Sequence, residues 1–232
     1  MTPGGSDRSN HPLSHNLSCL IHNLLQSGAC NFTHFINPQN YTLMSLDDLL
    51  GKLNQLHPVN PPFRVDLKSM MYFRFYDKRV KLMDFGERVK WAAYIEEGFV
   101  VGIVIRDGKE VVARIFQSGD IFTNMRGFFN DGNATMMLIT LTPCKLWILD
   151  REDYKKLEIY PETLKLKEAM QFVDQEIDAE LIHMLKLQVP DRFAYFASRY
   201  AFQYLPNKVC ASLLNIHETD YCKYKNEYLR RK

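Results

Sequence analysis

KWAAYIEEGFVVGIVIRDGKEVVARIFQSGD, residues 90–120, is the stretch of sequence that decides the fold. Three runs in it are apolar, β-branched or aromatic, as strands are: residues 91–95, 99–105 and 111–116. Glu97-Gly98 and Asp107-Gly108 separate these runs, and Asp-Gly suits a type I′ turn because both of its central residues need a positive φ. We therefore predict two successive hairpins, which form a meander that must pack on another layer or close on itself.

Other segments extend this meander into a larger antiparallel structure. Ser45 precedes two acidic residues and a helical pattern that His57-Pro58 ends, so we predict an N-capped helix there. Pro58, Pro61 and Pro62 predict an irregular passage, and residues 121–129 are expected to form a short helix. Further strand-like segments are residues 70–75, 80–84, 135–141 and 145–149. The predicted fold is α+β, an antiparallel β-barrel of the jelly-roll or double-stranded β-helix type with flanking helices.

The longest helical pattern in the chain begins at Pro161 and reaches about residue 187, after a short helix over residues 151–157 that Asp150 is expected to cap. Two interpretations of its apolar stripe stay open. The helix packs on its own domain, or it forms the seam of a two-helix dimer, which we favour because the stripe is long. The stripe recurs at steps of three and four residues: Leu166, Met170, Val173, Ile177, Leu181 and Met184.

The residues after Pro190-Asp191 predict a smaller helical unit. Helical patterns cover residues 192–204 and 207–214 and resume at about residue 217. Asn215 lies between the last two, and asparagine tolerates the left-handed conformation that a tight turn between helices requires. This is the pattern of a helix-turn-helix.

The composition is that of a globular protein, with 46% hydrophobic residues and a formal net charge of +2. No apolar run approaches the roughly 18 residues of a membrane helix, so we expect no membrane association. Five cysteines without close pairs, and no secretory pattern at the N-terminus, predict reduced thiols in a cytoplasmic protein. Residues 1–44 are expected to form a tail with a short amphipathic helix over residues 17–25.

The C-terminal segment from residue 206 carries a local positive excess of three charges. This excess favours a polyanion such as DNA, although a solvated basic terminus without a partner is the plainer explanation. The basic residues are Lys208, Lys223, Lys225, Arg230, Arg231 and Lys232, and the acidic ones are Glu218, Asp220 and Glu227.

Several motifs follow one another in an order that resembles a known superfamily. They are Phe85-Gly86-Glu87, Tyr94-Ile95-Glu96-Glu97-Gly98, Gly119-Asp120 and, after the long helix, Ala211-Ser212-Leu213-Leu214-Asn215-Ile216. Residues 45–232 resemble the superfamily of the cyclic-AMP receptor protein and the fumarate and nitrate reduction regulator. The resemblance implies a sensor barrel at residues 45–160, a dimer helix at 161–188 and a winged-helix-like helix-turn-helix domain that binds DNA at 189–232.

Members of this superfamily that bind a cyclic nucleotide carry a phosphate cassette with Gly-Glu at its start and Arg-Ser at its end. The resemblance places these pairs at Gly119-Asp120 and Ala134-Thr135, with Arg114 or Arg126 as a possible substitute cation. Ala134 lacks the charge that pairs with a phosphate, and losing this contact removes about 1.5–3 kcal/mol. We therefore expect a small effector other than a cyclic nucleotide, or none. The expected ligand pocket comprises Gly119, Asp120, Arg126, Ala134 and Thr135.

The resemblance places the DNA-reading helix at residues 216–223, where the match to the family pattern is degenerate. Thr219, Asp220 and Tyr221 stand where Glu, Thr and Leu are usual, and Cys222-Lys223 where Ser-Arg is usual. Lys223 offers a point charge instead of the two-pronged donor set with which an arginine grips guanine. The residues expected to contact DNA are Lys208, Thr219, Asp220, Lys223, Lys225 and Arg230.

The sequence thus predicts a homodimeric transcription regulator whose barrel senses an unknown small molecule and controls DNA binding. The alternative is a module that no longer binds DNA and acts on another protein.

We expect no enzymatic activity, because the sequence has no nucleophile elbow, phosphate loop or metal-binding histidine motif. We also expect no metal or cofactor. Cys19, Cys30 and Cys144 are one ligand short of an iron–sulfur set, and a haem ligand among His22, His34 and His57 stays open.

Overall fold

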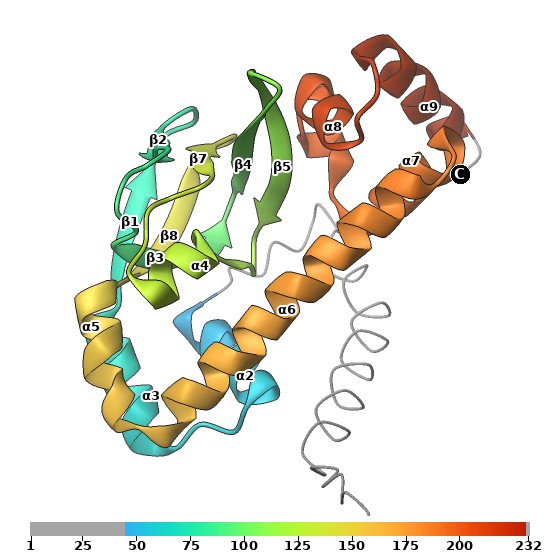
Figure 1. The fold of residues 1–232 in the computed structure, drawn as a ribbon. Helices are drawn as coiled ribbons and strands as arrows, with labels where there is room; N and C mark the ends of the chain where they lie inside the picture. The colour runs from blue at the N-terminus through green and yellow to red at the C-terminus, as the bar shows by residue number, and fades with distance from the viewer. Residues whose placement is uncertain (1–44, 231–232) are drawn as a thin grey trace, which may run out of the picture. The chain divides into compact units, whose positions relative to one another are not determined.

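The computed structural model describes residues 45–230 (Figure 1). Its strands form two antiparallel four-stranded sheets, in the orders β1-β8-β3-β6 and β2-β7-β4-β5, which face each other as a jelly-roll barrel. This confirms the predicted α+β fold class. The strands are β1 (Tyr72–Tyr76), β2 (Lys81–Met83), β3 (Trp91–Glu97), β4 (Phe99–Arg106), β5 (Lys109–Gln117), β6 (Ile121–Phe122), β7 (Met137–Thr140) and β8 (Cys144–Asp150).

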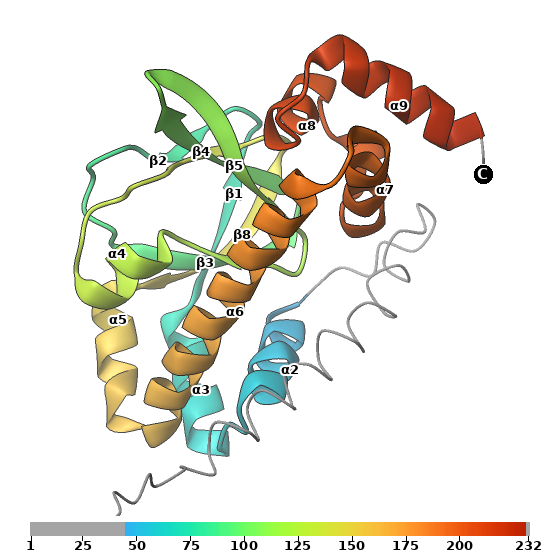
Figure 2. The same ribbon diagram turned by 45° about the vertical axis from the view of Figure 1, so that its right-hand side comes forward.

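Helices flank the barrel on one side and form the C-terminal unit (Figures 1 and 2). The longest, α6, runs along the barrel and leads to that unit. The predicted amphipathic helix over residues 17–25 lies outside the described residues. The helices are α2 (Leu46–Leu56), α3 (Pro61–Met70), α4 (Met125–Asn130), α5 (Arg151–Lys156), α6 (Pro161–Lys186), α7 (Val189–Arg199), α8 (Asn207–Leu213) and α9 (Glu218–Arg230), with 3-10 turns at Leu157–Ile159 and Phe202–Tyr204.

One of the two predicted hairpins is confirmed and the other is wrong. Strands β4 and β5 pair along their lengths, and Asp107 and Gly108 take φ values of 50° and 73° in the turn between them. Strands β3 and β4, however, belong to different sheets, so Gly98 is the corner at which the chain crosses from one sheet to the other. Its φ is 109°, and a Cβ there would lie 2.5 Å from the Pro143 carbonyl oxygen. A glycine between two strands could not reveal which sheet the second strand joins.

The irregular passage predicted from the prolines is confirmed at residues 57–60 but is wrong at Pro61 and Pro62. Pro61 and Pro62 begin α3, because a proline in the first turn gives up an N–H that has no partner there. Asn60 caps this helix by accepting from the Phe63 amide at 2.8 Å. Pro190 likewise lies in the first turn of α7. The predicted cap of α2 by Ser45 is confirmed as a reciprocal capping box with Asp48.

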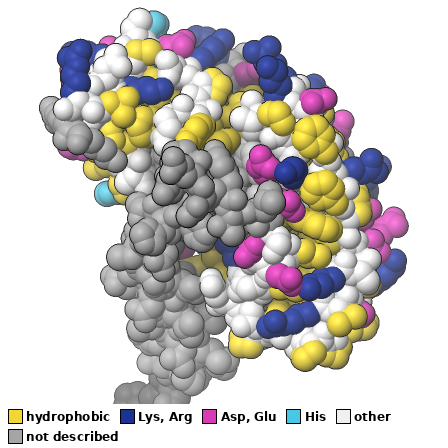
Figure 3. Space-filling model, turned by 180° about the vertical axis from the view of Figure 1, so that it is seen from behind, with side chains coloured by type: hydrophobic (Ala, Val, Ile, Leu, Met, Phe, Trp, Pro, Cys, Tyr) yellow, Lys and Arg dark blue, Asp and Glu magenta, His cyan; other side chains and the backbone are white. Residues whose placement is uncertain are grey.

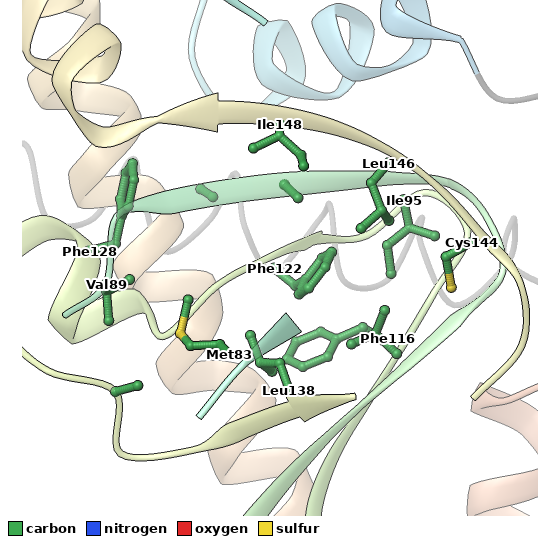
Figure 4. Packing of buried hydrophobic residues seen from close by; sticks show 14 of the residues in the cluster. Met83, Val89, Ile95, Phe116, Phe122, Phe128, Leu138, Cys144, Leu146 and Ile148 are labelled. Carbon is green, nitrogen blue, oxygen red and sulfur yellow. The ribbon is translucent and has the colours of Figure 1, made fainter. Parts of the chain in front are cut away.

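The barrel interior is filled by hydrophobic side chains from both sheets. Figure 4 shows Phe116 and Phe122 between Leu138 on one sheet and Ile148 on the other. The two phenylalanine rings lie 5.4 Å apart between centroids, and Phe122 and Leu138 are fully buried. This packing fixes the strands around the segment between β6 and β7, where the candidate ligand site lies.

The apolar stripe of α6 is largely covered by the rest of the chain. Leu166 is buried against α2 and α3, and Met170 packs against the barrel core. Met184 is buried in the C-terminal core, against which Leu181 also packs. The interpretation that the helix packs on its own chain therefore holds for these four residues, whereas Ile177 is 37% exposed and the dimer seam stays a prediction.

The C-terminal unit packs α7, α8 and α9 around Phe193, Phe196 and Tyr221, all of which are buried. Asn215 has a φ of 51° in the turn before α9, so the predicted left-handed turn residue is confirmed. Asp150 precedes α5 as predicted, although its carboxylate accepts from the Tyr72 hydroxyl at 3.1 Å and makes no capping hydrogen bond.

We predict that Gly98→Ala lowers the free energy of unfolding by about 2–5 kcal/mol, since it combines backbone strain with a steric clash. Gly108→Ala is the matched control, because its φ is also positive but no atom lies within 4 Å of the added Cβ. That control should cost only about 1–2 kcal/mol. Urea denaturation of both variants measures the difference, and equal losses would refute the role of Gly98 as a close-packed corner.

Candidate functional site

The Gly119-Asp120 pair forms a structural turn. Gly119 has a φ of 91° and donates its N–H to the Ile95 carbonyl at 2.7 Å. The Asp120 carboxylate accepts from the Gln117 amide at 2.9 Å and lies 3.9 Å from Nζ of Lys52 on α2. Burial raises the pKa of Asp120, and the charge of Lys52 opposes that rise. The carboxylate is thus engaged within its own turn and by α2.

The rest of the cassette follows this turn and lies between β6 and β7. Strand β6 ends at Phe122, and the loop then runs through Asn124, α4 and Asp131 to Ala134 and Thr135. Asp131 takes the left-handed conformation that ends α4. Thr135 therefore lies beside Asn124. Asp120, which was expected in the same pocket as Thr135, is held in the preceding turn.

Asn124 ties the two ends of the cassette together. Its Oδ1 accepts from the amides of Thr135 at 3.0 Å and Met136 at 2.9 Å, and its Nδ2 donates to the Met136 carbonyl at 2.9 Å. Two successive backbone N–H groups that converge on one oxygen form a nest, which is an anion-binding arrangement. Here the oxygen comes from a side chain of the same chain, and Asn124 is only 5% exposed.

Ala134 belongs to the wall of the barrel core and is 4% exposed. Its N–H donates to the Glu87 carbonyl at 2.7 Å, and its carbonyl accepts from Gly86 at 2.9 Å. Thr135 and Arg126 are both exposed, and Arg126 makes no ion pair with a described residue. Of the five expected pocket residues, only Ala134 and Thr135 thus lie at the end of the cassette.

Other cations near the cassette are engaged by carboxylates of the chain itself. Arg88 and Arg151 both pair with Asp131, and the hydrogen bond from Arg88 lowers the pKa of Asp131. Arg114 pairs with Asp174 at 3.1 Å and Asp178 at 2.6 Å, both on α6. With these arginines engaged and the nest filled by Asn124, the described residues of the cassette do not fit a cyclic phosphate.

The described cysteines are not arranged as metal ligands. Cys144 and Cys210 are buried, and burial raises the pKa of each thiol to about 11. Within residues 45–230, no group of three or more His, Cys, Asp or Glu side chains could hold a metal ion. Cys19, Cys30, His22 and His34 lie outside the described residues.

The helix-turn-helix presents a mixed set of side chains. On α9, Thr219, Asp220 and Lys223 are exposed, as Lys208 on α8 and Arg230 at the end of α9 also are. Lys225 differs, because it donates to Asn207 Oδ1 at 3.1 Å and so joins α9 to α8. The exposed acids Glu218 and Asp220 lie in the first turn of α9.

Asn124 is the residue that sequence reasoning missed. It lies within residues 121–129, for which the sequence predicts a short helix, and no motif marks it as a ligand or core residue. A polar residue gives no sign of burial unless its partners are known, and here they lie eleven and twelve residues further on. Only the tertiary structure therefore shows that Asn124 is buried and which backbone groups it bonds.

Comparison with known proteins agrees with this architecture. The family model of the cyclic nucleotide-binding domain matches residues 73–158, which comprise the barrel and α5. The matched family is a binding domain and not a catalytic one. The search of curated protein sequences gives no match.

Two solved structures of regulators resemble the chain. FixK2 from Bradyrhizobium japonicum superposes with a TM-score of 0.62 at 12% identity, covering 69% of this chain and 85% of FixK2. CLP from Xanthomonas campestris, a c-di-GMP-responsive global regulator, gives a TM-score of 0.56 at 18% identity, covering 74% of this chain and 93% of CLP. At these identities the likeness concerns the fold.

Residues 73–158 match the model of the cyclic nucleotide-binding domain, and the chain shares its fold with FixK2 and CLP. The resemblance that the sequence indicated is confirmed. The described helices include none that is both long and apolar enough to cross a membrane.

We predict that Asn124→Ala lowers the free energy of unfolding by about 2–4 kcal/mol, because it leaves two amides and a carbonyl without their partner. Arg126→Ala, two residues away and exposed, is the control and should change it by less than about 0.5 kcal/mol. Chemical denaturation measures both. A loss below about 1 kcal/mol for Asn124→Ala would show that water replaces the side chain, contrary to its role as the closure of the cassette.

Proposed function

We propose that this chain is a dimeric transcription regulator whose helix-turn-helix binds DNA and whose barrel responds to a signal other than a cyclic nucleotide. The observation that carries the proposal is the α8–turn–α9 unit, which leaves one side of α9 exposed while Tyr221 on its other side is buried. Residues 45–160, 161–188 and 189–232 are then its sensor, dimer and DNA-binding parts.

Direct contacts between the barrel and the C-terminal unit support a regulatory role. The Val112 amide on β5 donates to Ser212 Oγ on α8 at 3.0 Å, and Ile115 on β5 is buried in the C-terminal core. Arg192 on α7 donates to the carbonyls of Leu187 after α6 and Leu214 in the turn before α9. A shift of the barrel or of α6 would therefore change the position of α9.

Arg114 is the second link between the sensor and α6. Its side chain is 11% exposed, and its guanidinium pairs with Asp174 and Asp178, which lie one turn apart on α6. Burial raises the pKa of Asp174, and Arg114 opposes that rise. Separating Asp174 from Arg114 would leave a half-buried charge without its partner. A ligand that moved β5, which contains Arg114, would therefore also move α6.

Acidic residues limit the affinity for DNA. Glu218 and Asp220 stabilise the N-terminal end of α9 but would repel phosphates at the point where a recognition helix enters the major groove. Lys223 and Arg230 supply the attraction. The proposed DNA complex is therefore weak and strongly dependent on salt.

We predict that Lys223→Ala and Arg230→Ala each weaken binding to a mixed-sequence duplex and reduce the slope of log K against log salt by about 1. Asp220→Asn should strengthen binding, because it removes a negative charge that repels the DNA phosphates. Fluorescence anisotropy between about 50 and 200 mM salt measures these changes. Lys155→Ala, on the exposed surface of α5, is the control. Undetectable binding at the lowest salt, or an equal effect of the control, would contradict the proposal.

Dimerisation rests on the part of the α6 stripe that the chain leaves uncovered. Val173 is half-buried and Ile177 is 37% exposed, and Ile182, which lies next to the stripe residue Leu181, is 55% exposed. These side chains are the residues through which a second α6 would pack. Leu166, Met170, Leu181 and Met184, which we also assigned to the dimer interface, contribute by holding α6 in place.

We predict that the protein sediments as a dimer and that Val173→Glu with Ile177→Glu yields a monomer of 27.2 kDa, because buried charges without partners disrupt an apolar seam. Gln175→Glu adds the same charge at an exposed position between them and should leave the dimer intact. Analytical ultracentrifugation distinguishes the two. If the double variant sediments with the same dimeric mass as the wild type, the dimer interface does not include Val173 and Ile177.

A second candidate function is that of a protein-interaction module without DNA binding. Phe73 and Phe75 are 44% and 57% exposed on the edge strand β1, and the Phe73 ring lies 5.4 Å from Trp147. The view from behind shows hydrophobic side chains reaching the surface between charged ones (Figure 3). Exposed aromatic residues of this kind favour a protein partner.

A further inference from the structure

An apolar cavity of about 80 Å³ lies between strand β3 and helices α2, α3, α4 and α6. Three methionines line it, Met71, Met125 and Met170, and the other lining residues are almost all hydrophobic. Lys167 is the only charged residue in the described lining. The cavity is separate from the cassette nest that Asn124 fills.

Such a cavity favours an apolar occupant. A void with hydrophobic walls does not hold water stably, and its lining atoms lack dispersion contacts on one side. Methionine side chains are unbranched and change rotamer easily, so a methionine-lined wall can adapt to ligands larger than the cavity itself. The cavity therefore fits an alkyl chain better than a polar molecule.

Lys167 supplies an anion-binding group at this cavity. Its Nζ lies 5.6 Å from the centroid of the Phe129 ring, which also lines the cavity. Lys167 makes no ion pair with a described residue, and the adjacent Glu168 is paired with Lys165 at 3.1 Å. A carboxylate of a ligand could therefore pair with Lys167 without displacing an existing partner.

The position of the cavity connects it to the regulatory elements. Met125 and Phe128 on α4 form one wall, and Leu166 and Met170 on α6 form another. Helix α4 is the helix of the cassette, and α6 leads to the C-terminal unit. A ligand in the cavity would contact both helices and change how closely they pack.

We infer that this cavity binds a small amphiphilic acid, a straight-chain carboxylate of about four to eight carbons. The alkyl chain fills the space between α4 and α6, and the carboxylate pairs with Lys167. A role of this acid as the effector that controls DNA binding rests on the proposed function. Its binding to the cavity does not.

The experiment measures thermal unfolding of the full chain with butanoate, hexanoate, octanoate and dodecanoate, and with the primary alcohols of the same lengths. We expect a saturable rise in Tm that is largest for hexanoate or octanoate and smaller for dodecanoate. The alcohols should bind about tenfold more weakly than the acids, because they lack the charge that pairs with Lys167. Lys167→Met should remove this advantage and leave the alcohols unaffected.

Two variants that fill the cavity provide the decisive comparison. Ala92→Leu and Leu166→Phe both add volume at lining positions, and whichever folds with the wild-type circular dichroism should lose stabilisation by acids and alcohols alike. Ala113→Leu, on β5 outside this cavity, is the matched control and should bind as the wild type does. No saturable rise in the wild type, or an undiminished rise in a filled variant, would overturn the inference.

DNA affinity with and without octanoate then separates the two proposals. Acid binding without any DNA binding would leave the cavity site in place and refute the proposed function. If the protein binds DNA but no acid stabilises it, the cavity site is refuted and the proposed function stands.

Discussion

One helix has to serve three hydrophobic cores, and the arrangement of the other elements follows from this constraint. Leu166 completes the core under α2 and α3, Met170 packs on the barrel, and Met184 is buried in the C-terminal core. Because a closely packed core tolerates little displacement, α6 cannot move against one of these cores without disturbing another. The pairs that Arg114 forms with Asp174 and Asp178 fix the register of α6 on the barrel between them.

The cassette follows a second physical rule, that buried polar groups need partners. The amides of Thr135 and Met136 converge on a single point, and Asn124 supplies the oxygen there. The same backbone arrangement could accept a phosphate oxygen if it were vacant. Because Asn124 fills this position, the apolar cavity beside α4 is the better candidate for a ligand site.

Much of the fold could be predicted from local sequence signals. The Asp107-Gly108 hairpin, the Ser45 cap and the turn at Asn215 each depend on residues adjacent in the chain, and all three are confirmed. The predictions that were wrong required information from distant residues. Whether Gly98 lies in a hairpin or at a corner depends on the pairing of its two strands: β3 pairs with β6 and β8, whereas β4 pairs with β5 and β7. The contact of Asp120 with Lys52, on a helix far earlier in the chain, is a further feature that local sequence does not show.

The sequence by itself determined most of the order of the elements and the α+β class, which follow from periodicity and residue identity, and these are local properties. The superfamily resemblance rests on the order of a few short motifs, and the missing charge at Ala134 stays a prediction that this resemblance implies. Only the tertiary structure decided that Asn124 closes the cassette, that Lys225 supports α8 and that most of the α6 stripe is covered within the chain. The reason is that burial and hydrogen-bond partners are properties of pairs, and the partners here are separated by many residues along the chain.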